Sequence, residues 1–323
     1  MQSCGDFQDL TPPVVLNAVE EVLSCRLAPF THAHNSYINR VYELERDDGT
    51  RIIVKFYRPG RWTFEALVDE HDFVLDCFEA EIPVVPPDDL GDGVTLGEVD
   101  GVYFAVFEKR RGREFEVIDD TGWQRLGQIL GRMHVVGDEY EAEHRIVMHP
   151  RESTIRDIRQ LREGGFVTGA GQNVFFDTAD RILEYITPLF DDVHLQRIHG
   201  DCHCQNILER PEEGLMLIDF DDMVTGPTVQ DMWMLLPGHA HECRREIHLI
   251  LEGYEMFHEF DDHTLRLIEP LRAMRMLYFL AWCSRQLVDP NFTRKFPEWG
   301  TDSFWSRQAN DLQQQLNLIQ EHA

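Results

Sequence analysis

The sequence HGDCHCQNILERPEEGLMLIDFDD spans residues 199–222 of this 323-residue chain. Its first eight residues contain two histidines, two cysteines, an aspartate and an asparagine, which could be metal ligands or the parts of a catalytic loop. Two short apolar runs follow, joined by a turn that contains proline and glycine. This pattern predicts an antiparallel hairpin directly after the polar segment.

Zinc is the first candidate for the polar segment, because thiolate and imidazole are its ligands. His199 and His203 have the spacing of finger-type histidines, but one residue separates Cys202 from Cys204, where zinc sites have two to four. The other five of the seven cysteines are isolated along the sequence. Structural zinc therefore remains the weaker alternative, and packing of small side chains explains the two cysteines.

The oxygen-bearing side chains of the same segment favour magnesium. His199, Asp201 and Asn206 have the spacing H-x-D-x-x-x-x-N, which phosphoryl-transfer enzymes use for a catalytic aspartate and a magnesium-binding asparagine. Asn206 precedes the first predicted strand and Asp219 ends the second, so both should lie at one end of the hairpin, roughly 5 Å apart. Mg²⁺ needs only one or two such protein ligands. Turn formation is the alternative explanation for both residues.

A lysine within an apolar strand is the second unusual feature. The chain has three lysines, and Lys55 lies in the β-rich run RIIVKFY. It could extend to solvent from an edge strand. On the next predicted helix, Glu70 falls on the apolar stripe with Leu67 and Val74. A buried acid requires a cation, so we expect Lys55 and Glu70 to pair, as the lysine and glutamate that hold nucleotide phosphates do in kinases.

The pattern of elements predicts an α+β fold. A helix is expected over 12–27 and a hairpin over 40–57, with its turn at Asp47-Asp48-Gly49. A second helix is expected after Thr63 as its N-cap, and its apolar stripe also includes Leu75 and Phe78. A buried strand is expected over 101–108. Helices dominate from residue 123 onward, interrupted by the hairpin at 207–219. We therefore expect two lobes, a β-rich N-terminal lobe (1–107) and a mainly helical C-terminal lobe (108–323).

Several segments together resemble one known family. The segments HNSYINRVYEL, VKFYRPGRW, GVYFAVFE, HGDCHCQNIL, LIDFDD, GPTVQDMWMLL and IEPLRAMRMLYFLAW cover nearly the whole chain. They are similar to the bacterial stress response kinase A family, a branch of the aminoglycoside phosphotransferase-like proteins with the bilobal protein-kinase-like fold. The resemblance implies ATP as the phosphoryl donor, positioned by the N-terminal lobe (1–107), and Mg²⁺ as the cofactor.

The resemblance also implies roles for individual residues. Asp201 would accept the proton, Asn206 and Asp219 would bind magnesium, and Lys55 with Glu70 would position the phosphates. Ser36 would contact ATP, and Asp231 would hold the backbone of the catalytic loop. The chain departs from ordinary protein kinases because it has no G-x-G-x-x-G, has D-F-D in place of D-F-G, and has only 12 positions from Asp219 to Asp231, too few for an activation loop.

Composition excludes other classes of protein. The net charge of −28 should repel nucleic acid and anionic membranes, and the longest apolar runs are too short to cross a bilayer. The N-terminal segment lacks the features of a signal peptide, and the scattered cysteines suit a reducing compartment. We expect a cytoplasmic monomer.

The expected activity is ATP-dependent transfer to serine or threonine of a protein in the bacterial stress response. A kinase for small alcohols of the aminoglycoside, choline or homoserine type is the alternative acceptor class, since no peptide-binding loop is evident. A nucleotide-binding pseudokinase scaffold is the third hypothesis. Retention of Lys55, Asp201, Asn206 and Asp219 argues against the scaffold, because binding alone does not require a base.

Overall fold

The computed structural model describes residues 7, 10–28, 32–34, 38–210, 214–287 and 290–322. These residues pack into two compact units. The first unit combines Met1–Glu116, Ala142–Arg145 and Cys204–Asp222, and the second combines Val117–Glu141, Ile146–His203 and Met223–Ala323. The predicted α+β class is confirmed, with sheet in the N-terminal part and mainly helix in the C-terminal part. The lobe boundary near residue 108 remains a prediction. The compact units do not correspond to a single division of the chain, because the 204–222 segment packs with the N-terminal residues.

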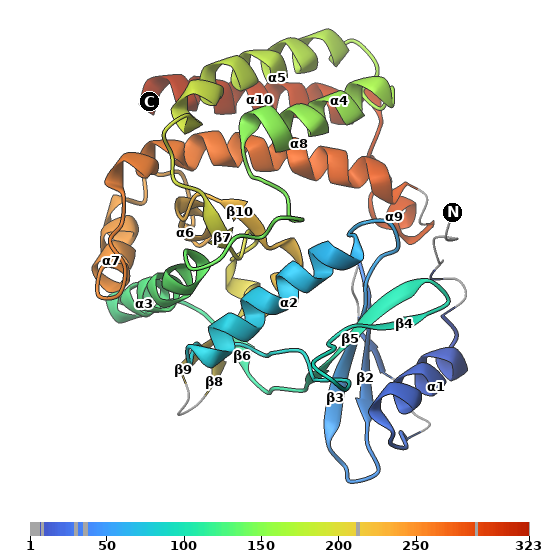
Figure 1. Ribbon diagram of the computed structural model, residues 1–323. Helices are drawn as coiled ribbons and strands as arrows, with labels where there is room; N and C mark the ends of the chain where they lie inside the picture. Colours follow the sequence, from blue (N-terminus) through green and yellow to red (C-terminus); the bar gives the residue numbers. More distant parts are fainter. Residues whose placement is uncertain are drawn as a thin grey trace. The chain divides into compact units, whose positions relative to one another are not determined.

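The first unit is built on a five-stranded antiparallel sheet in the order β1-β2-β3-β5-β4. Figure 1 labels β2, β3, β4 and β5 of this sheet. The predicted hairpin is confirmed, with Arg40 opposite Phe56. Its turn closes because Gly49 adopts a φ of 83° and Asp48 accepts a hydrogen bond from the Thr50 amide at 2.8 Å. The strands are β1 (His32–His34), β2 (Arg40–Glu45), β3 (Arg51–Phe56), β4 (Gly97–Val99) and β5 (Val102–Glu108).

Alternation along β3 separates the core from the site. Ile52, Val54 and Phe56 are buried in a cluster with side chains of helix α1 (Pro12–Leu23). Ile53 and Lys55 point to the opposite face, because successive strand residues alternate. The predicted helix over 12–27 ends earlier, at Leu23, since Ser24 takes a left-handed φ of 48°.

Helix α2 (Phe64–Glu79) carries the predicted glutamate on its buried face. The hydroxyl of Thr63 accepts a hydrogen bond from the Ala66 amide at 3.2 Å, so the predicted N-cap is confirmed. Glu70 is 2% exposed. Phe78 is 51% exposed, so placing it on the buried stripe was wrong. The buried face instead consists of Ala66, Leu67, Glu70, His71, Phe73, Val74 and Cys77.

A smaller sheet completes the first unit. The hairpin predicted for 207–219 is present as β8 (Ile207–Arg210) and β9 (Gly214–Leu217), paired antiparallel. A short strand that was not predicted, β6 (Arg113–Glu114), pairs with β8. Leu217 also donates its amide to the carbonyl of Pro83 at 2.9 Å. The hairpin is therefore bound on both sides by residues of the N-terminal segment.

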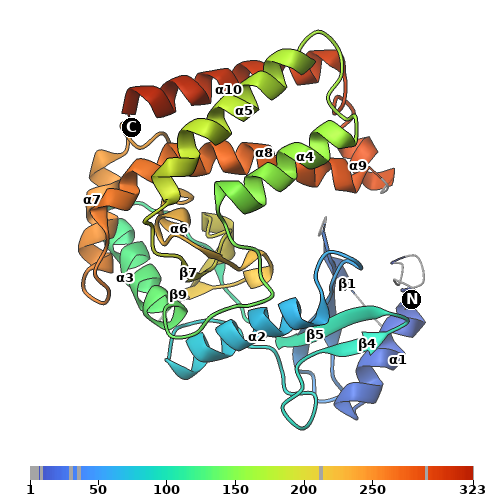
Figure 2. The ribbon, with the colours of Figure 1, turned by 45° about the horizontal axis from the view of Figure 1, so that its top comes forward.

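The second unit is mainly helical. Helix α10 packs against α5 and α8, and α4 also packs against α8, as Figures 1 and 2 show. An antiparallel pair of short strands, β7 and β10, was not predicted. The elements are α3 (Asp120–Gly137), α4 (Ile155–Glu163), α5 (Gln172–Ile186), β7 (Gln196–Ile198), β10 (Val224–Gly226), α6 (Val229–Trp233), α7 (Arg244–Tyr254), α8 (Ile268–Gln286), α9 (Pro290–Lys295) and α10 (Asp302–His322).

Two glycines allow α3 and α7 to approach closely. A Cβ on Gly127 would lie 1.9 Å from the carbonyl oxygen of Ile250, and one on Gly253 would lie 2.0 Å from that of Gln124. Backbone atoms cannot yield to such a contact, so only glycine fits at these positions. Among the described residues, no helix is both long enough and apolar enough to span a bilayer.

Candidate active site

A cavity of about 280 Å³ lies entirely within the first unit. Val41, Ile53 and Phe107 of the five-stranded sheet line it, as do Leu208 and Ile218 of the small sheet and the residue that follows it. Such apolar walls suit a flat ring. Lys55, Glu70 and Asp219 line the same cavity, so an apolar slot and a group of charges are combined in one space.

Lys55 is surrounded by three carboxylates. Its Nζ lies 3.5 Å from Oε1 of Glu70, 3.3 Å from Oδ1 of Asp219 and 3.2 Å from Oδ1 of Asp221. The predicted contact between Lys55 and Glu70 is therefore present. Burial alone would lower the pKa of Lys55, but the carboxylates of Asp221 and Glu70 outweigh burial and raise that pKa well above its ordinary value. The ammonium group stays charged at every physiological pH.

Glu70 has a second cation that sequence reasoning missed. Nη2 of Arg145 donates to Oε2 of Glu70 at 2.5 Å, and its Nη1 donates to the backbone carbonyl of Asp221 at 2.9 Å. The Arg145 guanidinium also lies 4.2 Å from the centre of the Trp62 ring. Arg145 thus connects helix α2 with the segment that carries Asp219.

Asp221, the last residue of the D-F-D motif, is also part of this charge cluster. It is 4% exposed and pairs with Arg61 as well as Lys55. Arg61 in turn contacts Asp222 at 2.6 Å. Burial would raise the pKa of Asp221, but Lys55, Arg61 and Arg145 lower it well below its ordinary value. A buried carboxylate here thus remains ionised because cations surround it.

Asn206 and Asp219 lie at the same end of the β8–β9 hairpin, as predicted. The amide of Ile218 donates to the carbonyl of Asn206 at 3.0 Å, and Asp219 is the next residue. Asp219 adopts a left-handed φ of 63°, and its side chain is 56% exposed. An aspartate in that conformation is uncommon and often marks a functional position. These two oxygen donors fit Mg²⁺, which keeps most of its coordination for water and phosphate.

The histidines and cysteines of the 199–206 segment do not form a metal cluster. Cys202 is fully buried and Cys204 is half-buried. Within the described ranges, no three His, Cys, Asp or Glu side chains gather as a closed metal site would require.

Asp201 belongs to the second unit, where an arginine and a histidine contact its carboxylate. Nη2 of Arg275 lies 2.5 Å from Oδ1 of Asp201, and Nε2 of His203 lies 3.5 Å from Oδ2. Burial would raise the pKa of Asp201, but His203 and Arg275 outweigh burial and lower it. The carboxylate therefore stays ionised at neutral pH.

The backbone before Asp201 is fixed by Asp231. The two carboxylate oxygens of Asp231 accept hydrogen bonds from the amides of His199 and Gly200, both at 2.8 Å. Nε2 of His134 lies 3.1 Å from the same carboxylate. His199 is itself buried, and its Nδ1 accepts a hydrogen bond from the Asp201 amide at 3.4 Å. The geometry is that of the predicted clamp on this loop.

One predicted residue falls outside the description. Ser36, expected to contact ATP, lies outside the described residues. Four charged residues were missed. No local pattern indicates Arg61 or Arg145, whereas Asp221 is the last residue of the D-F-D motif. Arg275 had a usable signal, because it follows Arg272 by three residues within the apolar sequence IEPLRAMRMLYFLAW.

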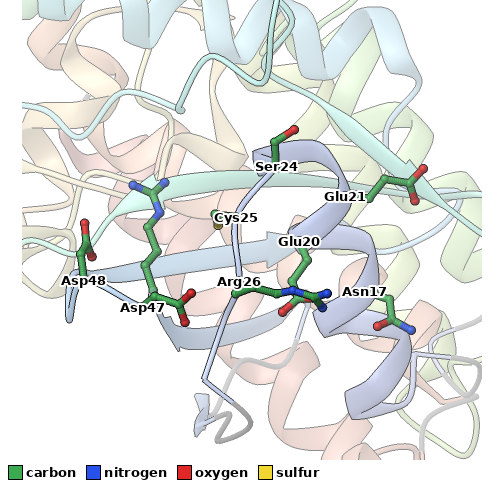
Figure 3. Close-up of a pocket in the computed structure, with 9 residues that line it drawn as sticks. Asn17, Glu20, Glu21, Ser24, Cys25, Arg26, Asp47 and Asp48 are labelled. Carbon is green, nitrogen blue, oxygen red and sulfur yellow. The ribbon is translucent and has the colours of Figure 1, made fainter.

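A second hollow, of about 710 Å³, lies beside α1 and the β2–β3 turn (Figure 3). Its lining is acidic and includes Glu21 and Asp48. Glu20 binds Arg26 at 3.2 Å and accepts the Leu27 amide at 2.9 Å, so it stabilises the end of α1. Lys55, Glu70 and Asp219, which line the smaller cavity, do not line this hollow.

Comparison with known proteins gives a consistent family. Residues 31–268 match the model of the phosphotransferase enzyme family. Stress response kinase A of Escherichia coli (strain K12) is 38% identical over 323 residues, which are 99% of this chain and 96% of that protein. Serine/threonine protein kinase RdoA of Salmonella typhimurium (strain LT2) is 35% identical over 319 residues, 98% of this chain and 95% of that protein.

Solved structures agree on the fold. A microcompartment-associated aminopropanol kinase superimposes with a TM-score of 0.70 at 18% identity, covering 95% of this chain and 98% of that one. Amicoumacin kinase hAmiN in complex with AMP-PNP, Ca²⁺ and Ami gives a TM-score of 0.66 at 18% identity, covering 87% of this chain and 88% of that one.

Proposed function

We propose, from the premise that this chain belongs to the phosphotransferase enzyme family and is a kinase, that it transfers the γ-phosphoryl group of Mg-ATP to serine or threonine of a protein. The observation that carries the nucleotide part is the cavity in the first unit, where apolar walls and Lys55 with Asp219 share one space. The acceptor class rests on a relative at 35% identity that is named a serine/threonine protein kinase.

The cavity suggests how a nucleotide binds. Val41, Ile53 and Phe107 would contact one face of the adenine ring, and Leu208 and Ile218 the other. Lys55 would exchange one of its three carboxylate contacts for phosphate oxygens. The free-energy cost is small, because two carboxylate contacts remain. Magnesium, when bound by Asn206 and Asp219, supplies charge neutralisation at the phosphates.

Asp201 would take the proton of the acceptor hydroxyl during transfer. Its lowered pKa keeps it ionised, and the Asp231 clamp fixes its backbone. Proton transfer to such a carboxylate late in the reaction suits phosphoryl transfer, in which positioning and charge neutralisation dominate. We also propose that the enzyme acts in the cytoplasm as a monomer, in the stress response for which its relatives are named.

The test is a comparison of acceptors with purified enzyme. Radiolabelled ATP is supplied with Mg²⁺ and either serine and threonine peptides or a panel of aminoglycosides, choline and homoserine. Transfer to peptides, with hydroxyl-linked phosphate identified by mass spectrometry, is the expected result. Transfer to a small alcohol alone would replace the proposed acceptor class, and nucleotide binding without any transfer would indicate a scaffold.

A further inference from the structure

The two oxygens of the proposed base contact an arginine and a histidine within the second unit. Arg275 contacts Oδ1 of Asp201 at 2.5 Å, and His203 lies 3.5 Å from Oδ2. The side chain of Arg275 is 35% exposed and that of Asp201 is 19% exposed. An acceptor hydroxyl that approaches Asp201 must therefore compete with a cation for the carboxylate.

The face of α8 around Arg275 is basic and aromatic. Arg272, one turn earlier, lies with its guanidinium 4.8 Å from the centre of the Trp233 ring. Phe279, one turn later, is 46% exposed and stacks on Trp282 with ring centres 5.8 Å apart. These four α8 residues are spaced at i, i+3, i+7 and i+10, so they share one face of the helix.

From this arrangement we infer that Arg275 selects the acceptor: the enzyme prefers a serine or threonine that has an aspartate or glutamate beside it in the peptide. The inference rests on the proposed function and narrows its substrate class. A carboxylate brought by the acceptor would bind the Arg275 guanidinium while Asp201 turns to the hydroxyl.

The preference follows from the charges that must be separated. With a neutral acceptor, Arg275 loses its carboxylate partner when Asp201 engages the hydroxyl. The acceptor then offers no anion in its place, so part of the interaction energy of Arg275 is lost. With a cationic acceptor, such as an aminoglycoside, a like charge is added beside Arg275. Only an acidic acceptor keeps both the arginine and the base satisfied, so charge complementarity favours it.

The experiment uses matched peptides with one serine and either aspartate, asparagine or lysine at a flanking position, tested at each side of the serine in turn. We expect kcat/KM for the aspartate peptide to exceed that for the asparagine peptide by about tenfold at low salt, with the lysine peptide lower still. In Arg275→Gln this ratio should fall to near one, whereas Arg275→Lys should retain part of it.

Arg285→Gln is the matched control on the same helix. Arg285 is also partly exposed and hydrogen-bonds to Gln160 at 2.8 Å, so its replacement should leave the ratio unchanged. An equal rate for all three wild-type peptides would overturn the inference and leave the proposed function intact. So would Arg275→Gln lowering every rate by one factor, since that describes a residue that only orients Asp201. Failure to phosphorylate any peptide, with transfer to small alcohols, would overturn both.

Discussion

Nη2 of Arg145 lies 2.5 Å from Oε2 of Glu70, whereas Nζ of Lys55 lies 3.5 Å from Oε1 of the same carboxylate. Glu70 is therefore shared by two cations, and its shorter contact is with the arginine. Arg145 reaches it because Ala142–Arg145 is packed in the first unit although the residues on both sides belong to the second. His144 adds a second anchor, since its amide donates to Asp69 of α2 at 2.7 Å.

This sharing changes what is expected of the Lys55–Glu70 pair. Loss of Glu70 leaves Lys55 with Asp219 and Asp221, so Glu70→Gln should reduce kcat/KM for ATP far less than Lys55→Met. Arg145→Met should instead destabilise the fold by about 3–5 kcal/mol, because it leaves a buried carboxylate with a weaker partner. The double variant Glu70→Gln/Arg145→Met should lose about 1–3 kcal/mol less stability than the sum of the losses in the two single variants. Urea unfolding measures the stabilities, and steady-state kinetics measures the turnover.

The exposed pair Arg162 and Asp180, 2.7 Å apart, serves as the control for that cycle. Its coupling should not exceed about 1 kcal/mol, because solvent screens it. Additive effects of Glu70→Gln and Arg145→Met would show that the two residues do not depend on each other.

Asp201→Asn should separate binding from catalysis. The amide keeps the shape of the side chain but cannot take a proton, so kcat should fall about 10²- to 10⁴-fold. Affinity for ATP, measured by calorimetry, should remain near that of the wild type, because the contacts of Asp201 are made in the second unit and the cavity proposed for the nucleotide is in the first. A matching loss of ATP affinity would assign Asp201 a structural role.

Asp219→Asn tests the magnesium site with little disturbance of the backbone. Asparagine tolerates the left-handed φ of 63° that Asp219 adopts, whereas alanine would add strain. Binding of ATP should be stronger with Mg²⁺ than with EDTA in the wild type, and this difference should largely disappear in Asp219→Asn and Asp219→Ala. Stoichiometric zinc in the purified protein, with unfolding on chelation, would instead revive the zinc alternative.

Asp157 should make stability depend on pH. Burial raises its pKa from 3.8 to about 6, and Nη1 of Arg285 lies 4.0 Å away. The folded state therefore binds the Asp157 proton more tightly than the unfolded chain does. Protonated Asp157 makes its full contribution to the stability of the fold below pH 4, and this stability is lost as the pH rises through 6. Asp157→Asn should raise the free energy of unfolding at pH 8 by up to about 3 kcal/mol, with no gain below pH 4.

The matched control for this effect is Asp180→Asn, since Asp180 is exposed. Chemical unfolding at a series of pH values measures both variants. A gain in Asp157→Asn that is the same at pH 4 and pH 8 would exclude titration of Asp157 as its cause.

Local patterns predicted the elements that position the site. The rare lysine in β3, the acid on the buried face of α2 and the short hairpin after Asn206 each follow from spacing within about 20 residues. The register of the hairpin then placed Asn206 and Asp219 together, because Ile218 pairs with Asn206. Alternation along β3 likewise directed Lys55 away from the core and toward the cavity.

Contacts between distant segments could not be predicted in the same way. Arg145 is 75 residues from Glu70, and Arg275 is 74 residues from Asp201. No periodicity relates such positions, since they meet only through the packing of other elements. The strands β7 and β10 were missed for another reason, because each has only three residues, too few to show the alternation that marks a strand.

The discontinuity of the first unit has a consequence for biosynthesis. Residues up to 116 leave the ribosome first, but the wall formed by Leu208 and Ile218 is translated about a hundred residues later. Until then the carbonyl of Pro83 lacks the Leu217 amide that it accepts in the finished protein, and Lys55 lacks Asp219 and Asp221. The nascent N-terminal segment therefore lacks these partners until the 204–222 segment has been made, a state that invites chaperone binding. The cavity proposed for the nucleotide gains its last lining residue only when Phe220 has been synthesised.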